Sequence, residues 1–465
     1  MTETVGKESF NSKGFRTAKL LGTSPSTFTL MQGTPAYEEA RKGFWSQEQA
    51  DCTPYCIRQP KNAQGVAEVL SVLEETGCPF AIKSGGHGRS QGESSISAGV
   101  LIDLKYLNNI QLSEDKRTCR VGPGCTWAEV YGQLNPAGLT VIGGRASTVG
   151  VGGFCISGGI SFFSNRHGWA LDNVLSFEVV LSGGIMLQAS PSSHPDLYKA
   201  LRGGGANFGI VTDLELAVYP YEGIWGGGVS WAWEHGDAII DTFIEYGEDN
   251  VGNADAAAIL GTVNYQGQWI WYAELEHLKP TPPEKRSVLG RFLKIPSLLD
   301  ATGPTSQIER TDSIVSHYPT GCHNGYWTFC TQVDKRILKY FMETWREEVD
   351  PLLDIDGIDK AALADVNFVS QNIVDAMSRN GGNALGLAGK GPFLLFLMES
   401  LWMETAQSER DVYSGYGATA KDFLALVSDK YDPKSIFQHQ RGAGWHLHGS
   451  ILGPVDGQGA NSTKA

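Results

Sequence analysis

Two glycine-rich runs place the strongest constraint on how this chain folds. The first reads Ile82-Lys-Ser-Gly-Gly-His-Gly-Arg-Ser90, and the second reads Gly143-Gly-Arg-Ala-Ser-Thr-Val-Gly-Val-Gly-Gly153. Glycine allows positive φ and lets backbone N–H groups come close to an anion. The cations and hydroxyls of the first run suit the diphosphate of a buried dinucleotide. The residues expected to bind it are Lys83, Ser84, Gly85, Gly86, Gly88, Arg89, Ser90, Gly150, Gly152 and Gly153.

Neither run matches the Rossmann fingerprint. That motif requires G-x-G-x-x-G between a strand and a helix, with an acidic residue about 20 positions later. A third cluster, Gly203-Gly-Gly-Ala-Asn-Phe-Gly209, also departs from it. A single cluster of this kind is equally compatible with plain turns, because glycine is common there. Three clusters within one region favour ligand binding over turns alone.

Four motifs in a fixed order carry a family resemblance. They are Ser84-Gly-Gly-His87, Thr148-Val-Gly-Val-Gly-Gly153, Asp172-Asn-Val174 and Asn207-Phe-Gly-Ile-Val-Thr212. The chain thereby resembles fungal berberine bridge enzyme-like FAD-linked oxidases of the vanillyl-alcohol oxidase superfamily, which have a p-cresol methylhydroxylase-type FAD domain. The resemblance implies an α+β fold, FAD as cofactor and covalent 8α attachment at His87. It also implies cofactor contacts from Gly144, Thr148, Val149, Gly209, Ile210 and Val211.

Two positions in the second run refine what the resemblance implies. Many relatives form a second flavin bond through a cysteine three residues before the valine at 149, and this chain has Ala146 there. We therefore expect a single covalent bond, because Cys155 is too distant along the loop to substitute. In the relatives, a valine at the place of Val149 accompanies access of O2 to the flavin. This favours an oxidase over a dehydrogenase.

The length of 465 residues predicts two domains. We expect an FAD-binding domain over 1–220 with its core at 52–220, and a substrate-binding domain over 221–412 whose antiparallel sheet is covered by helices. Residues 413–465 are expected to return to the first domain, because Asp432-Pro-Lys-Ser-Ile-Phe437 resembles the C-terminal piece of the family.

Hydrophobic periodicity predicts individual elements. It indicates helices at 63–76, 127–134, 195–202, 236–248, 283–294 and 335–349. It indicates strands at 56–60, 79–83, 99–103, 118–122, 209–216, 326–333, 366–370 and 393–402, together with a hairpin over 176–188. Residues 1–50 show no clear helical period.

The candidates for proton transfer lie in the expected substrate-domain sheet. A flavin accepts a hydride, so the protein must take up the accompanying proton. Tyr272 and Glu274 share one face of a strand, and Tyr326 and His323 are further candidates. Glu399, within an apolar strand, would have a raised pKa if it is desolvated, as a general base needs. The alternative is that Glu399 faces solvent or pairs with a cation.

Charge and composition limit the partners and the compartment. The net charge of -14 disfavours nucleic acid and anionic membranes, and no apolar run approaches the ~18 residues needed for a span. The N-terminus lacks signal-peptide features, so we expect a cytoplasmic protein, or a secreted one if a signal was removed. The eight cysteines show no zinc-site spacing, so no metal is expected. A disulfide at Cys52 or Cys56 stays open, as does the oligomeric state.

These observations predict an FAD-dependent oxidase that dehydrogenates a small, apolar or aromatic specialised metabolite, with O2 as electron acceptor and H2O2 as product. One alternative is a redox-neutral or oxidative cyclase, including Diels–Alder-type closure, which some members of the resembling family perform. A second alternative is a flavin-holding binding protein without turnover.

Overall fold

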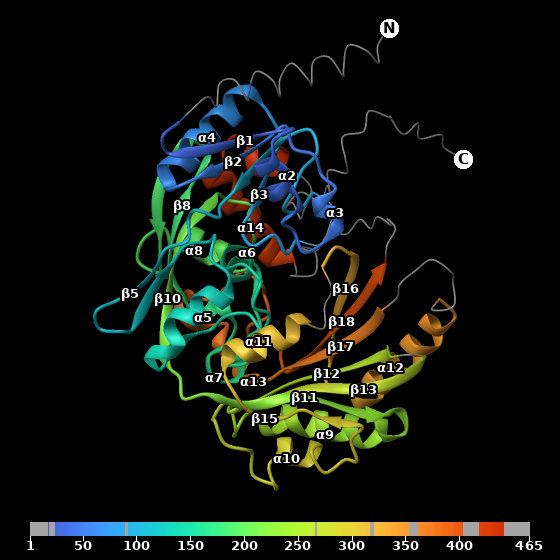
Figure 1. Ribbon diagram of the computed structural model, residues 1–465. Helices are drawn as coiled ribbons and strands as arrows, with labels where there is room; N and C mark the ends of the chain where they lie inside the picture. The colour runs from blue at the N-terminus through green and yellow to red at the C-terminus, as the bar shows by residue number, and fades with distance from the viewer. Residues whose placement is uncertain are drawn as a thin grey trace.

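The computed structural model describes Thr17 and residues 24–88, 92–265, 267–316, 320–352, 361–402 and 418–440. Among these residues the strands form three sheets, two in the N-terminal half and one in the C-terminal half (Figure 1). Helices and sheets are mixed along the chain, so the predicted α+β fold class is confirmed. In the described part of the chain, no helix combines the length and apolarity needed to cross a membrane. All eight cysteines are free thiols.

The first sheet delivers the first glycine-rich run from the end of one of its strands. Its order is β1-β2-β4-β3, with β1 antiparallel to β2 and the other pairs parallel. Helix α4 joins β2 to β3; the Asn62 side chain caps its start and Gly77, at φ 62°, ends it. The elements of this part are β1 (Thr27–Met31), α2 (Pro35–Lys42), α3 (Gln47–Ala50), β2 (Cys56–Pro60), α4 (Ala63–Thr76), β3 (Phe80–Lys83) and β4 (Val100–Asp103).

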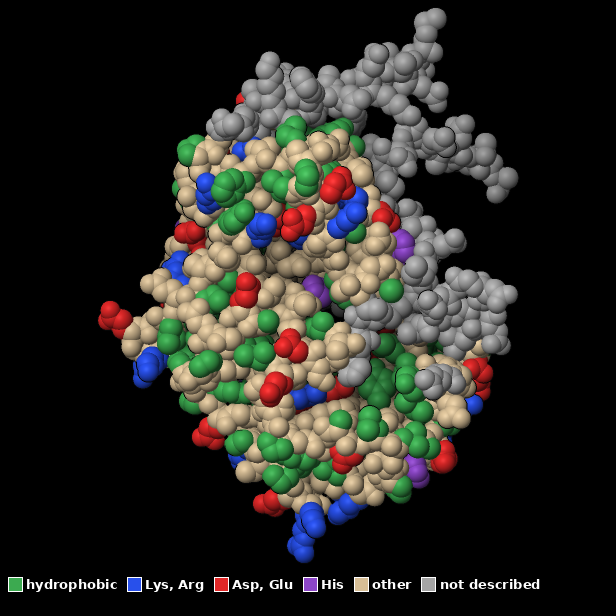
Figure 2. Space-filling view, in the orientation of Figure 1, with side chains coloured by type: hydrophobic (Ala, Val, Ile, Leu, Met, Phe, Trp, Pro, Cys, Tyr) green, Lys and Arg blue, Asp and Glu red, His purple; other side chains and the backbone are tan. Residues whose placement is uncertain are grey.

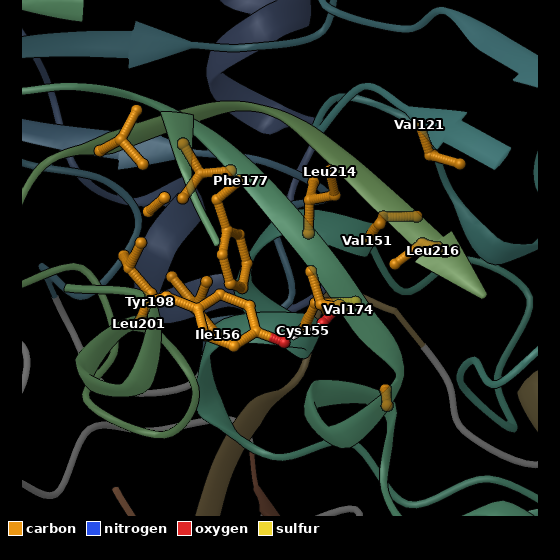
Figure 3. Packing of buried hydrophobic residues seen from close by; sticks show 14 of the residues in the cluster. Val121, Val151, Cys155, Ile156, Val174, Phe177, Tyr198, Leu201, Leu214 and Leu216 are labelled. Atoms are coloured by element: carbon orange, nitrogen blue, oxygen red, sulfur yellow. Dashed lines mark hydrogen bonds between the residues drawn. The ribbon is translucent and has the colours of Figure 1, made fainter. Parts of the chain in front are cut away.

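The second sheet packs over the largest core of the N-terminal half. Its strand order is β5-β6-β10-β8-β9, and β7 pairs with β10. Phe177 of β8, Tyr198 of α8 and Leu214 of β10 meet in this core (Figure 3). Its elements are β5 (Ile110–Leu112), β6 (Thr118–Val121), α5 (Trp127–Leu134), β7 (Leu139–Val141), α6 (Val151–Ser157), α7 (Ser164–His167), β8 (Val174–Val180), β9 (Met186–Ala189), α8 (Pro195–Leu201) and β10 (Ile210–Pro220).

The third sheet is antiparallel and has two chemically different faces. Its order is β14-β11-β13-β12-β17-β18-β16, and β15 pairs with β11. One face, with Trp231, Trp271 and Phe396, packs against α9, α10 and α12. The elements are β11 (Ile224–Ala232), α9 (Gly236–Asp249), β12 (Ala256–Tyr265), β13 (Gln268–His277), α10 (Val288–Phe292), β14 (Leu299–Asp300), β15 (Gly303–Thr305), α11 (Gln307–Ser316), β16 (His323–Gln332), α12 (Lys335–Val349), β17 (Ala361–Val369), α13 (Gln371–Ala376) and β18 (Phe393–Trp402).

The opposite face of the third sheet is directed toward the N-terminal half. In Figure 1, α9, α10 and α12 lie on the side of the sheet away from the first two sheets. Tyr272 and Glu274 alternate with the buried Trp271 and Ala273 along β13, so they project from the face that these helices leave uncovered. Any ligand held by the N-terminal half at this boundary therefore meets a partly polar sheet.

The C-terminal helices α14 (Ala418–Tyr431) and α15 (Ile436–His439) lie against the N-terminal half. Leu424 and Val427 join the core around Phe177. The hydroxyl of Tyr431 donates to Asp196 of α8 at 2.7 Å. The chain thus passes through the third sheet and comes back to the first two.

Most predicted elements are present, and the differences have physical causes. The helix expected over 283–294 is confined to α10, and residues 24–50 contain β1, α2 and α3, which their pattern did not indicate. Helix α11 was not predicted at all. Its fully buried side chains are Gln307, Arg310 and Thr311, whereas Ile308 and Ile314 are partly buried, so polar residues fill most of its packed face and weaken the apolar period.

Candidate active site

The two glycine-rich runs lie directly against each other. A Cβ atom on Gly85 would fall 2.3 Å from the backbone nitrogen of Gly150, and one on Gly150 would fall 2.3 Å from the nitrogen of Gly85. The Ser84 hydroxyl accepts the N–H of Gly152 at 3.2 Å and donates to the carbonyl of Pro123. Positions 85 and 150 therefore need glycine, because the backbones of the two runs are in direct contact there.

His87 stands where these runs meet the N-terminal segment. Its Nε2 lies 2.9 Å from the hydroxyl oxygen of Thr148, in the second run. The ring of Trp45 stacks on the imidazole, with centroids 5.5 Å apart and planes 12° from parallel. The imidazole is half-buried, so it is held in place and keeps partial access to solvent.

Other expected cofactor residues take different positions. Lys83 is buried, its ammonium donates to the carbonyl of Ala40 at 3.4 Å, and burial lowers its pKa. Gly144 leaves room for the indole of Trp127, which a Cβ would approach to 2.6 Å. Lys83 thus contacts α2 and Gly144 contacts α5, so both residues pack the loops against neighbouring helices.

The remaining expected residues divide in the same way. Ile210 and Val211 are buried in the sheet core, and Gly209 packs on Val179. Gly153, by contrast, is exposed, and an added Cβ would have no protein atom within 4 Å. Gly86 and Gly88 keep the His87 loop compact against neighbouring side chains. Arg89 and Ser90 lie outside the described residues.

The uncovered face of the third sheet carries a tyrosine–carboxylate pair. The hydroxyl of Tyr272 in β13 donates to the carboxylate of Asp365 in β17. Gly261 of β12 lies between them, and a Cβ there would come within 2.3 Å of the carboxylate. Burial raises the pKa of Asp365 to about 6, although the Tyr272 hydrogen bond opposes the rise. Sequence reasoning found Tyr272 and missed Asp365, a lone acid in the apolar stretch of 361–369.

Arg145 connects the second glycine-rich run to this sheet face. Its Nη1 donates to the side-chain oxygen of Asn367 at 2.9 Å, two residues along β17 from Asp365. Its positive charge lowers the pKa of Asp365, against the larger effect of burial. The tyrosine–carboxylate pair is therefore next to the run that also holds Thr148.

Glu274 and Glu276 of β13 form a buried ion-pair network with Arg310 of α11. Arg310 donates to both carboxylates, at 3.0 Å to Glu276. Burial raises the pKa of Glu276 to about 7, and Arg310 lowers it. Glu274, a predicted catalytic candidate, is thus held by a cation. No sequence pattern indicated that Arg310 would pair with these two carboxylates.

Tyr326 and Glu399 are opposite each other on adjacent strands β16 and β18. Such pairs project from the same face of a sheet. Glu399 is fully buried, which agrees with the expected desolvation. The ring of Tyr326 lies 6.2 Å from that of Trp45, edge to face. Trp45 thereby lies between His87 and the Tyr326–Glu399 row. His323, at the start of β16, has its Nδ1 3.9 Å from Glu48.

These features suit a flavin dinucleotide. Gly153 presents bare main chain, Thr148 presents a hydroxyl, and His87 presents a ring nitrogen at the boundary of the two halves. The surface is hollowed between the upper and lower parts of the molecule (Figure 2).

Comparison with known proteins identifies the family. A model of the FAD binding domain matches residues 54–190. The FAD-dependent monooxygenase tpcD of Cochliobolus heterostrophus is 31% identical over 440 residues, which cover 85% of each chain. An uncharacterized FAD-linked oxidoreductase of Arthroderma benhamiae is 32% identical over 83% of this chain and 79% of its own length. The chain belongs to the family of fungal FAD-dependent monooxygenases and FAD-linked oxidoreductases that these relatives represent.

Solved structures agree with the fold of this flavoenzyme. The 6-hydroxy-D-nicotine oxidase of Arthrobacter nicotinovorans superposes with a TM-score of 0.74 at 18% identity, covering 90% of this chain and 98% of that one. Glucooligosaccharide oxidase of Acremonium strictum, described with 6-S-cysteinyl, 8α-N1-histidyl FAD, superposes with a TM-score of 0.73 at 15% identity, covering 90% and 97%. The sequence relatives confirm the predicted identity as an FAD-dependent enzyme, and these structures confirm the fold.

The flavoenzyme has no thiol at the place where the family resemblance implies a second flavin bond. Ala146 occupies that position in the second run. The nearest cysteine along the chain, Cys155, is fully buried within α6, and burial raises the pKa of its thiol. It packs in the core with Val151 and Phe177.

Proposed function

We propose that the flavoenzyme is an oxidase that dehydrogenates a small, apolar or aromatic metabolite, with O2 as electron acceptor and H2O2 as product. The substrate loses a hydride and a proton, and bound FAD supplies the hydride acceptor. The observation that carries the proposal is the Tyr272–Asp365 pair, which Arg145 places beside the loops of the FAD-binding half.

We propose further that His87 holds the FAD covalently and alone. Its imidazole is fixed by Thr148 and Trp45 at the boundary of the two halves. A histidyl linkage is described for the glucooligosaccharide oxidase, together with a cysteinyl one that Ala146 precludes here. The backbone around Gly85, Gly150 and Gly153 would hold the diphosphate.

The tyrosine–carboxylate pair supplies the proton acceptor. Tyr272 Oη takes the substrate proton while its own proton passes to the Asp365 carboxylate along the existing hydrogen bond. This transfer requires ionised Asp365, and a pKa of about 6 leaves most of that carboxylate ionised at neutral pH. The cross-strand pair of Tyr326 and Glu399, on the same sheet face as Tyr272 and Asp365, would orient the substrate. Glu274, held by Arg310, would anchor the sheet.

The lining of the same sheet face supports an apolar substrate. Leu397 and Gly261 flank Asp365 on the adjacent strands, and Leu363 flanks Glu399. Leu397 is partly exposed and Leu363 is buried, so the polar pairs are separated by aliphatic surface. These aliphatic side chains would contact the apolar part of a substrate, between the polar pairs.

The direct test combines cofactor and O2 measurements on purified enzyme. We expect a yellow protein whose flavin stays with the acid-precipitated chain, and stoichiometric O2 uptake and H2O2 release with a productive metabolite. Flavin released wholly into the acid supernatant would refute the His87 bond. A colourless protein that stays apo when FAD is added would refute the function.

Monooxygenation is a second candidate, because curated relatives such as tpcD are named FAD-dependent monooxygenases. Labelled O2 separates the two reactions: an oxidase leaves the label in H2O2, whereas a monooxygenase transfers one oxygen atom to the product. Conversion without O2 uptake would instead indicate the redox-neutral cyclase.

A further inference from the structure

Residues 44–48, which we name the Trp45 strap, tie the two halves of the enzyme together. The N–H of Trp45 donates to the carbonyl of Gly86 at 3.1 Å, in the His87 loop. The N–H of Gly321 donates to the carbonyl of Trp45 at 3.3 Å, and that of Gln47 donates to Cys322 at 2.9 Å. The strap is therefore fixed by main-chain hydrogen bonds to the His87 loop on one side and to the residues just before β16 on the other. It precedes the 54–190 range matched by the FAD-domain model.

The His87 loop is shaped to receive this strap. Gly86 has φ 74°, and a Cβ there would lie 3.2 Å from both the carbonyl of Gly43 and the ring of Phe44. Glycine at 86 thus serves the close approach of the strap as well as the turn of the loop. At the other end, Glu48 and His323 lie 3.9 Å apart, and both are mostly buried.

The side chain of Trp45 contacts both His87, in the first glycine-rich run, and Tyr326, on the uncovered face of the third sheet. The indole is only 8% exposed. Its face stacks on the imidazole of His87, and the ring of Tyr326 meets it at 63°. A rigid aromatic plane with a fixed backbone restricts the orientation of both neighbouring rings.

We propose that Trp45 is a positioning residue that fixes the imidazole of His87 in the orientation needed for flavin attachment. The same indole fixes the position of the Tyr326 ring relative to that imidazole. This inference rests on the proposed function of His87. It adds a contact from the N-terminal segment that sets how the flavin anchor and the substrate sheet face each other.

The test uses the full chain with Trp45→Ala, Trp45→Phe and a matched control, Trp233→Ala. Trp233 is partly buried and stacks on Trp271 at 5.2 Å and 24°, against the core of the helix-covered face. Apo-protein is mixed with FAD, and total bound flavin and its acid-stable fraction are followed over time. In Trp45→Ala we expect normal total FAD and attachment slowed by at least ~10-fold, because a reacting group is no longer oriented. Trp45→Phe should recover most of the rate, and the control should keep all of it.

Two outcomes of this experiment would overturn the inference. One is attachment in Trp45→Ala at the wild-type rate. The other is loss of all FAD and of folding in both Trp45 variants, which would show a purely structural role.

A second readout stays decisive if the wild-type enzyme holds FAD without a covalent bond, which would refute the proposed function of His87. The NMR signal of 13Cε1-labelled His87, identified with His87→Asn, should then shift in Trp45→Ala and not in Trp233→Ala. An unchanged signal would refute the positioning role independently.

Discussion

Asp365 is a carboxyl group whose proton is retained to a higher pH than in water, because burial disfavours its ionised form. If it accepts the Tyr272 proton, turnover should rise with pH through about 6, where Asp365 ionises. Asp365→Asn should abolish this rise and lower kcat by ~10²–10⁴-fold. The measurement is the pH dependence of anaerobic flavin reduction by substrate. An unchanged pH profile in the variant would contradict the assignment.

Glu399→Gln serves as the matched comparison at the same scale. Glu399 is also buried and lies on the same sheet, but its cross-strand partner is Tyr326. If proton transfer belongs to the Tyr272–Asp365 pair, this variant should keep the pH profile and change mainly KM. A loss of flavin reduction confined to Glu399→Gln would move the catalytic role to the neighbouring row.

At the scale of elements, the two glycine-rich loops depend on direct backbone contact. Gly85→Ala places a methyl group 2.3 Å from the Gly150 nitrogen, so the loops must separate. We expect loss of FAD binding, measured by the flavin-to-protein absorbance ratio, and a lower thermal midpoint. Gly132→Ala is the control, because Gly132 is on the exposed face of α5 and a Cβ there contacts nothing within 4 Å. It should stabilise the protein by about 0.5–1 kcal/mol. Equal flavin content in both variants would contradict the close contact.

Helix α11 is attached to β13 through buried charge. Arg310→Met leaves Glu274 and Glu276 without their cation, and breaking such a pair costs about 3–5 kcal/mol. We expect this loss in the free energy of unfolding from urea titrations. The triple variant with Glu274→Gln and Glu276→Gln as well should recover much of it. A single variant as stable as the wild type would contradict the role of the network.

At the scale of the whole molecule, buried carboxyls set the pH dependence of stability. Burial raises the pKa of Glu48, Glu276 and Asp432 to about 7 and that of Asp365 to about 6. A raised folded-state pKa stabilises at acidic pH, and that contribution is lost as pH rises through it. His167 acts oppositely: burial lowers its pKa to about 4, so its contribution is lost as pH falls.

The four carboxyls outweigh the single histidine, so the free energy of unfolding should fall from pH ~5 to pH ~7.5 by several kcal/mol, at about 1.4 kcal/mol for each pKa unit crossed. Urea titrations at these two pH values check the sign. Asp432→Asn should reduce the slope, because Asp432 caps α15 through the N–H groups of Ile436 and Phe437 and its ionisation is removed. A protein that becomes more stable toward pH ~7.5 would contradict this account.

The sequence by itself determined the elements whose cause is local. Helix α4 has an apolar stripe, a capping Asn62 and an ending Gly77, all within one stretch of chain. The order of four motifs, among them the two glycine-rich runs, resembled one family and thereby implied FAD, which the similar proteins bear out. Tyr272 and Glu274 were predicted together because residues two apart in a strand share a face, and Glu399 was predicted because it lies in an apolar strand.

The tertiary structure alone decided which distant residues meet. Asp365 is paired with Tyr272 across Gly261, and Arg310 with Glu276, through contacts between strands and helices far apart in sequence. Trp45 reaches His87 from a segment without periodicity. Lys83 is buried and donates to the carbonyl of Ala40 in α2, a contact that its sequence neighbours did not indicate, and its part in cofactor binding stays a prediction. These partners are set by packing between elements far apart in the sequence, so the local sequence pattern around each residue cannot predict them.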